Sequence, residues 1–130
     1  MPDIFADPIA SREEFQNALL TVRDRHKIKE SQLKMLRCQY AAPNHTISAG
    51  GLSSAMGFEK VTTGNLQYAA FAHLVADVLG YQAPKTKGHG PQWWTTFSLG
   101  RADPEQTTAG QFEWVMRPEL AEALKEMNWV

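Results

Sequence analysis

The chain has 130 residues, of which 43% are hydrophobic and 21% charged, a balance typical of a folded globular domain rather than a disordered chain. A formal net charge of −1 argues against a protein that wraps nucleic acid over its whole surface. No apolar run approaches the roughly 20 residues that span a bilayer, and the N-terminus lacks a basic leader, so we expect a cytoplasmic protein. The single cysteine, Cys38, cannot form an internal disulfide and lacks the neighbours of a zinc site.

Charge is distributed unevenly along the chain. Residues 23–37 hold six cations and two acids, and residues 82–101 hold three cations and no acid. Residues 103–126 reverse this, with six acids and two cations. A basic surface of this kind could meet nucleic-acid phosphates or an acidic protein, and it could equally be an ordinary solvated face.

Two helices are predicted before Pro43. The first begins near Ser11, where "SREEF" offers a capping box with Glu14, and its buried face repeats at helical spacing through Phe15, Leu19 and Val22. The second starts after Ser31 as N-cap and buries Leu33, Leu36 and Tyr40. The segment "RDRHKIKE" between them is either a linker or a continuation of the first helix.

A short helix, a turn and a long helix follow. The short helix spans about Ala49 to Met56, is capped by Thr46 or Ser48, and ends at Gly57 in the left-handed conformation. "FEKVT" makes the turn, and Thr62 or Thr63 caps a long helix that ends at Gly80. Its expected buried stripe is Leu66, Ala70, Leu74 and Val78, widened by Phe71, Val75 and Leu79.

The periodicity changes after the loop "YQAPKTKGHGPQ". "WWTTFSLG" and "QFEWVM" are aromatic and β-branched and predict two strands, joined as a hairpin by the ten-residue loop "RADPEQTTAG". Pro118 then opens a final helix with Glu119 in its first turn. Its buried face is Leu120, Leu124 and Met127, and Trp129 docks the chain end.

This order of elements predicts a mainly helical α+β fold, with a winged helix-turn-helix-like core, a C-terminal β-hairpin and a final helix. In such motifs the second helix of the pair enters the major groove of DNA. We divide the chain into an N-terminal helix with a basic linker, residues 1–30, and a winged helix-turn-helix-like domain, residues 31–130.

The stretches "LKMLRCQYAAPNHTISAGGLSSAMGF", "NLQYAAFAHLVADVLGY" and "EWVMRPELAEALKEMNWV" resemble a non-catalytic domain found beside HNH-type endonuclease domains in bacterial and phage proteins. The resemblance covers about residues 33–130 and implies a role in binding the nuclease target. It does not imply cleavage here, because an HNH site needs a ββα-metal unit with paired histidines and an asparagine. The histidines of this chain are scattered outside any such context: His26, His45, His73 and His89.

Other catalytic motifs are also missing from the sequence. It has no Walker loop, dinucleotide fingerprint or nucleophile elbow, and "GHG" is too short to cradle a phosphate. His73 lies four residues before Asp77, a spacing that suits a helix-surface hydrogen bond better than an acid–base pair. We therefore expect a non-enzyme that uses no cofactor and no metal.

For binding to double-stranded DNA, the candidates follow from the geometry of a recognition helix, which contacts bases with its N-terminal turns. Asparagine and glutamine can pair bidentately with adenine, and threonine can reach base or phosphate. On the long helix the candidates are Thr63, Asn65, Gln67 and Tyr68, of which Tyr68 could instead belong to the core. Further candidates are Asn44, His45 and Thr46 at the entrance of the preceding helix, Lys85 and Lys87 beside the groove, and Arg101 on the wing.

A protein-binding module is the alternative. Trp93, Trp94, Trp114 and Trp129 are many tryptophans for this length, and exposed aromatic residues anchor interfaces. Such a module could be a phage-encoded anti-defence protein, of the anti-CRISPR type, that inhibits a host defence nuclease or ribonucleoprotein. A homodimer is a further arrangement that the sequence allows.

Overall fold

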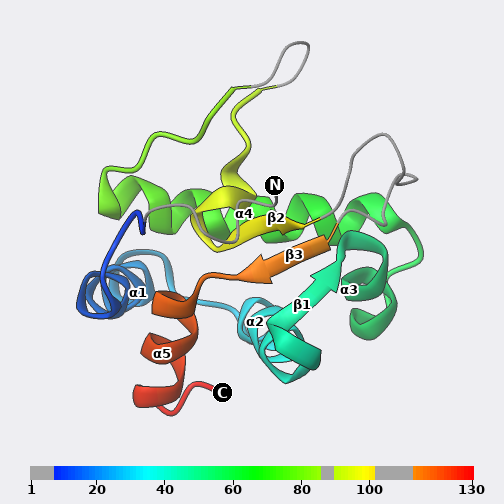
Figure 1. The fold of residues 1–130 in the computed structure, drawn as a ribbon, viewed down its shortest axis with the longest axis horizontal. Helices are drawn as coiled ribbons and strands as arrows, with labels where there is room; N and C mark the ends of the chain where they lie inside the picture. The colour runs from blue at the N-terminus through cyan, green and yellow to red at the C-terminus, as the bar shows by residue number, and fades with distance from the viewer. Residues whose placement is uncertain (1–7, 86–89, 102–112) are drawn as a thin grey trace.

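The computed structural model describes residues 8–85, 90–101 and 113–130 (Figure 1). In chain order its elements are α1 (Arg12–His26), α2 (Glu30–Ala41), the 3-10 turn η2 (Pro43–His45), β1 (Thr46–Ser48), α3 (Ala49–Met56), α4 (Val61–Leu79), the 3-10 turn η3 (Trp93–Thr96), β2 (Ser98–Arg101), β3 (Glu113–Met116) and α5 (Pro118–Glu126). The predicted candidate Lys87 and most of the predicted hairpin loop lie outside the described residues.

The strands of the described residues form one antiparallel sheet in the order β1-β3-β2. β2 and β3 pair from Ser98 opposite Met116 to Arg101 opposite Glu113. β1, which precedes α3 in the chain, pairs with the other edge of β3 and places Ser48 opposite Glu113. A strand that precedes the helix-turn-helix thus pairs with a hairpin that follows it, which is the winged-helix arrangement. The predicted fold class, mainly helical α+β with a hairpin and a final helix, is confirmed.

α4 runs the length of the molecule, and the other elements pack around it (Figure 1). Its inward face meets α1, α3 and η3. Its Tyr68 and Phe71 rings each make an edge-to-face contact with Phe97, at centroid distances of 5.5 and 5.3 Å. Buried aromatic pairs of this geometry stabilise a core beyond the area they bury. This core sets the position of α4 relative to the sheet.

The first helix belongs to the same core. Phe15, Ala18, Leu19 and Val22 of α1 are buried in one cluster with Phe71 and the other core residues of α4. The predicted separate segment of residues 1–30 therefore contains a helix, Arg12–His26, that packs on the rest of the fold.

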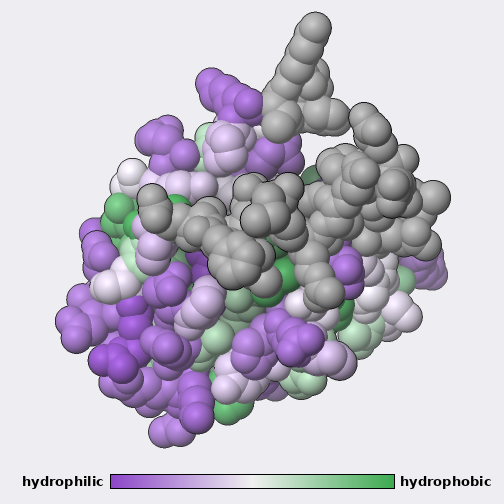
Figure 2. Space-filling model, viewed as in Figure 1, coloured by the Kyte–Doolittle hydropathy of each residue, from purple (hydrophilic) through white to green (hydrophobic). Residues whose placement is uncertain are grey.

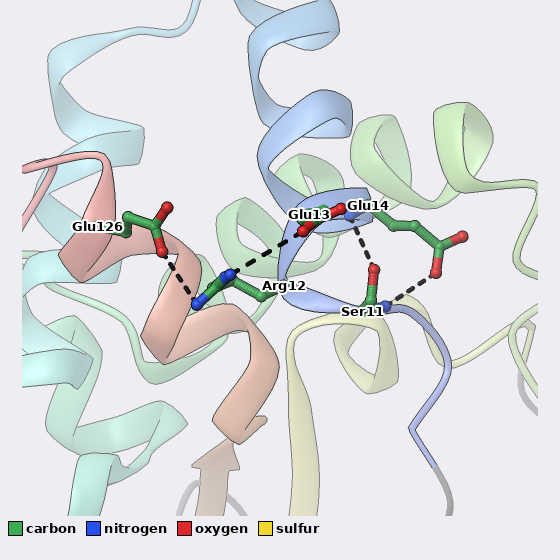
Figure 3. A network of polar contacts seen from close by, with 5 residues as sticks. All are labelled: Ser11, Arg12, Glu13, Glu14 and Glu126. Carbon is green, nitrogen blue, oxygen red and sulfur yellow. Dashed lines mark hydrogen bonds and ion pairs between the residues drawn. The ribbon is translucent and has the colours of Figure 1, made fainter.

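Figure 3 shows how α1 begins. The Glu14 amide donates to the Ser11 hydroxyl at 3.1 Å, and the Ser11 amide donates to the Glu14 carboxylate at 2.9 Å. This is the capping box predicted from "SREEF". In the same view Arg12 bridges to Glu126 of α5 at 3.1 Å and to Glu13 at 4.0 Å, so the start of α1 is tied to the end of the last helix.

Helix ends follow the predicted chemistry at several positions. Ser48 caps α3 by accepting the Gly51 amide at 2.9 Å, and Gly57 and Gly80 end α3 and α4 with φ of 79° and 74°. Pro118 opens α5 as predicted. Because left-handed backbone carries little penalty for glycine, these residues mark both C-termini in the sequence.

Three predicted boundaries were wrong. α2 begins at Glu30 instead of after Ser31, because the Gln32 side chain accepts the Lys29 amide at 2.8 Å and so starts the helix earlier. α4 begins at Val61, and neither Thr62 nor Thr63 caps it. The strand predicted for "WWTTFSLG" is β2 only from Ser98 onward. Its first four residues form η3, where Thr95 turns back to donate its hydroxyl to the Gln92 carbonyl at 2.8 Å.

The predicted stripe of α4 was also wrong at its N-terminal end. Leu66 is 67% exposed and Ala70 is exposed, whereas Tyr68, Phe71 and Val75 are fully buried. Both stripes repeat at helical spacing, so periodicity alone cannot rank them. The aromatic stripe takes the core because only it meets Phe97 and the sheet.

Candidate nucleic-acid interface

The start of α4 is held against α3 by one close contact. The Ser53 hydroxyl of α3 accepts the Gly64 amide of α4 at 2.9 Å, and Ser53 is buried. A Cβ atom on Gly64 would lie 2.3 Å from the Ser53 Oγ and 3.2 Å from the carbonyl oxygen of Ala49. Glycine is therefore required for this approach of the two helices. The N-cap residue of α4, Lys60, makes no side-chain cap, so α3 supplies a hydrogen-bond acceptor for the first turns of α4.

Beyond that contact, the first turns of α4 face outward. Thr62, Asn65, Leu66 and Gln67 are exposed, and Thr63 is half-buried. From Val61 to Ala76 the helix carries no carboxylate, and the exposed Lys60 directly precedes it. The exposed N-terminal face is thus polar and uncharged, with a cation at the end where the helix dipole is positive.

The hairpin lies on the same side of the molecule. β2 ends at Arg101 opposite Glu113, where β3 begins, and Ser48 at the end of β1 also lies opposite Glu113. Since α3 follows Ser48 directly, this end of the sheet adjoins the helix-turn-helix. Figure 1 shows the end of β2 and the start of α4 on the same side of the fold. The structure therefore brings Thr63, Asn65 and Gln67 to the side where the backbone of Arg101 ends β2.

Tyr68 is a core residue, and its prediction as a DNA contact was wrong. Its side chain is fully buried and stacks on Trp114 at a centroid distance of 4.3 Å. Its hydroxyl donates to Gln39 Oε1 at 2.6 Å and lies 2.6 Å from Ser98 Oγ, which in turn accepts from Gln39 Nε2 at 2.8 Å. Burial raises the pKa of Tyr68 far above its ordinary value, and the hydrogen bonds with Ser98 and Gln39 lower it only in part.

The placement of Asn44, His45 and Thr46 at the entrance of α3 was also wrong. Asn44 and His45 belong to η2 and Thr46 is the first residue of β1, whereas the N-cap of α3 is Ser48. His45 is held by its Nδ1–H, which donates to the Tyr40 carbonyl at 2.6 Å, and by stacking on the Tyr40 ring at 4.4 Å. Thr46 pairs with Val115, toward the end of the sheet away from Arg101 and Glu113.

Asn44 and His45 instead line a cavity of about 320 Å³ on the side of α5. The other residues around it are Leu99, Val115, Met116, Pro118, Ala121 and Glu122. This cavity therefore belongs to the sheet and the last helix rather than to the start of α4.

Of the predicted lysines of the following loop, Lys85 is not beside the start of α4. Lys85 is exposed and pairs through its backbone with Pro91, in the segment that follows the C-terminal end of α4 (Figure 1). That end and the start of α4 lie on opposite sides of the fold. Lys87 and the side chain of Arg101 lie outside the described residues.

The basic run of residues 23–37 does not add to this face either. Arg23 pairs with Asp24 at 3.2 Å, and Arg37 donates to the Trp129 carbonyl at 2.7 Å near the chain end. α1 lies across the fold from the start of α4 (Figure 1). Figure 2 shows strongly hydrophilic residues gathered over α1 and α5. The charge of α1 therefore lies away from the first turns of α4.

Two residues of the face, Lys60 and Leu66, escaped prediction. Lys60 was assigned to the turn because no side-chain cap marks the true start of α4. Leu66 was assigned to the core because it is apolar and in phase with Leu74 and Val78. The sequence did indicate the alternative, because the stripe of Tyr68, Phe71 and Val75 contains larger aromatic side chains, which are usually the ones buried.

His73 pairs with Asp77 at 3.4 Å and stacks on Trp93 at 3.8 Å, with both side chains of the pair about half exposed or more. Among the described residues, no group of three or more His, Cys, Asp or Glu side chains could hold a metal. Trp114 is buried, and Trp93, Trp94 and Trp129 are half-buried.

No helix in the described ranges is long and apolar enough to cross a membrane. Comparison of the chain with protein-family models, with curated proteins and with solved structures finds no match.

Proposed function

We propose that the chain is a non-catalytic module that binds double-stranded DNA, with the first turns of α4 in the major groove and the β2–β3 hairpin beside them. One observation carries the proposal. The strand order β1-β3-β2 sets the hairpin on the side where α4 begins, and the outward face of those first turns is polar and free of carboxylates. A helix of this kind fits the major groove, whose base edges offer hydrogen-bond donors and acceptors.

Base contacts are assigned to the side-chain amides. Asn65 and Gln67 are exposed and lie within the first two turns of α4, so their amides can reach the N6 and N7 atoms of adenine. Thr62 and Thr63 are placed for a base or a phosphate. The Ser53–Gly64 contact fixes the angle between α3 and α4 and so sets how far α4 projects.

Phosphate contacts are few. Lys60 at the N-cap is the described cation on this side, and the helix N-terminus adds backbone amides. Since each neutralised phosphate contributes about −0.9 to the slope of log K against log salt, one such contact predicts a slope of about −1. Binding is therefore modest in affinity and readily lost as salt rises.

This function agrees with the resemblance of residues 33–130 to the domain beside HNH-type nucleases, in which it would form the targeting part. The cleavage step is not proposed for this chain.

The test is binding to a pool of random-sequence duplexes at about 50 mM salt, followed by selection of the bound sites and measurement of Kd by fluorescence anisotropy. We expect Asn65→Ala with Gln67→Ala to weaken binding to the selected site at least 10-fold, because each bidentate pair is worth about 1–3 kcal/mol. The matched control replaces Asn17 and Gln82, which are also exposed but lie outside α4. No binding to any duplex, or equal loss in the control, contradicts the proposal.

A protein-binding role is the second candidate, and Leu66 is the observation that favours it. A leucine 67% exposed on an uncharged helix face could pack against a partner protein, such as a host defence nuclease or ribonucleoprotein, or against a second copy of the chain. Sedimentation of the purified chain tests the homodimer, and capture from host extract with wild type and Leu66→Asp tests the partner. A chain that stays monomeric, recovers no specific partner and binds DNA rejects this candidate.

A further inference from the structure

Leu66 is unusual among the apolar residues of this fold. In the described part of the chain, only Leu66 and the C-terminal Val130 are large hydrophobic residues with exposed side chains, at 67% and 38%. The exposure of Val130 needs no explanation, because it is the last residue. Leu66 instead sits within a helix whose apolar neighbours Tyr68, Phe71 and Val75 are fully buried. Leu66 is therefore exposed because it lies on the side of α4 that faces away from the core.

Leu66 is also central on that face. Each residue of an α-helix is rotated by about 100° from the last, so Thr62 and Ala70 lie one turn before and after Leu66 on the same side. Asn65 and Gln67 flank it on either side. All of these residues are exposed and none is charged. Leu66 is thus the one large apolar side chain on a face that also carries the small Ala70 and the hydrogen-bonding side chains of Thr62, Asn65 and Gln67.

The major groove offers one apolar group among its polar base edges, the methyl group on C5 of a pyrimidine. Thymine carries it, and so does cytosine after methylation, whereas unmethylated cytosine presents a C–H there. Apolar side chains contact this methyl group while asparagine and glutamine pair with adenine. Leu66 and the amides of Asn65 and Gln67, all exposed in the first turns of α4, are the kinds of group that this pattern of recognition uses.

We propose that Leu66 is a specificity-determining residue that packs against the C5-methyl group of a pyrimidine, and that this chain therefore reads a methyl-bearing base step within its DNA site. The inference rests on the proposed DNA binding. The helix carries no carboxylate from Val61 to Ala76, so its outward face does not repel phosphate, and the exposed pair Glu59 and Lys60 directly precedes it.

The experiment uses the full chain and the selected duplex. Each thymine in turn is replaced by deoxyuridine, which removes only the methyl group and leaves base pairing unchanged. We expect one position to lose about 3- to 5-fold in affinity for the wild type, the amount expected of one buried methyl group. For Leu66→Ala, thymine and deoxyuridine should bind equally at that position. Val130→Ala is the matched control and should keep the discrimination.

A second selection distinguishes the two sources of the methyl group. It uses a pool synthesised with 5-methylcytosine in place of cytosine. Enrichment of thymine at the Leu66-dependent position in both pools assigns the contact to thymine, and a site found only in the methylated pool assigns it to 5-methylcytosine.

The outcomes separate the two proposals. DNA binding with no methyl effect at any position, or a methyl effect that persists in Leu66→Ala, overturns the role of Leu66 and leaves DNA binding standing. If the chain binds DNA from neither of the two pools, the proposed function itself is overturned. A change of oligomeric state in Leu66→Ala assigns the face to a protein interface and also overturns the inference. Because Leu66 is exposed, its alanine variant should keep the wild-type circular dichroism spectrum and Tm, which confirms that the folded protein is compared.

Discussion

The two halves of α4 share one continuous helix but differ in surroundings. In the C-terminal half Phe71 and Val75 are fully buried, and Trp93 of η3 stacks on His73 of the outer side. In the N-terminal half Leu66 is 67% exposed, and α3 packs closely enough at Gly64 to leave no room for a Cβ atom there. Neither half carries a lysine or arginine. The elements that cover the helix therefore decide which of its residues can meet a ligand.

The largest expected effect contrasts one large apolar residue from each half. Phe71→Ala should lower the free energy of unfolding by about 3–5 kcal/mol, because it opens a cavity beside Phe97. Leu66→Ala should change it by less than about 0.5 kcal/mol, because its side chain is already in water. Urea unfolding of both variants measures the difference. Equal destabilisation would show that the two halves are not distinguished by burial.

A smaller effect tests how the exposed half is held. Gly64→Ala should cost about 1–3 kcal/mol, because the added Cβ would lie 2.3 Å from the Ser53 Oγ and force α3 and α4 apart. It should weaken DNA binding as well, since the angle of α4 changes. Gly90→Ala is the control, because open space surrounds that position. In the double variant with Ser53→Ala, the two losses should be less than additive, and strict additivity would mean that the two residues do not interact.

The smallest effect concerns the boundary between the halves, where Tyr68 turns inward. Tyr68→Phe should cost about 1–2 kcal/mol, because it leaves Gln39 and Ser98 with an incomplete ring of hydrogen bonds.

The raised pKa of Tyr68 also predicts that the stability of the protein depends on pH. Because burial raises the pKa of Tyr68 in the folded state, its stabilising contribution is complete below the unfolded tyrosine pKa of about 10 and is lost as pH rises above it. Between about pH 10 and 11, wild type should therefore lose stability more steeply than Tyr68→Phe, by up to about 1.4 kcal/mol per pH unit. Parallel profiles in unfolding titrations would show that Tyr68 titrates alike in both states.

Local chemistry made much of the fold predictable. The Ser11–Glu14 capping box, the glycines that end α3 and α4, and Pro118 at the start of α5 act through neighbours within a few residues. The order of helices and hairpin followed from them. The start of α4 did not, because its hydrogen-bond acceptor is Ser53, eleven residues earlier on another helix.

The candidate site was predictable only in part, for the same reason. The exposure of Asn65 and Gln67 agrees with the expectation that the first turns of the long helix face outward. The strand β1 was not expected, because three residues show no clear alternation before they pair with β3, and so Asn44, His45 and Thr46 were misplaced. Leu66 was expected in the core and is exposed, whereas Tyr68, two residues later, was a candidate DNA contact and is buried.

The sequence by itself determined where α1 and α5 begin and where α3 and α4 end, because capping side chains, Pro118 and left-handed glycines act on the backbone nearby. It also determined that α4 would be long and free of lysine and arginine. Only the tertiary structure decided which stripe of that helix is buried, because Phe97, Ser98 and Trp114, which lie 29 or more residues after Tyr68 in the chain, pack against Tyr68 and not against Leu66. Because burial depends on residues distant in the chain, the tertiary structure also determines which face of α4 stays exposed to a ligand.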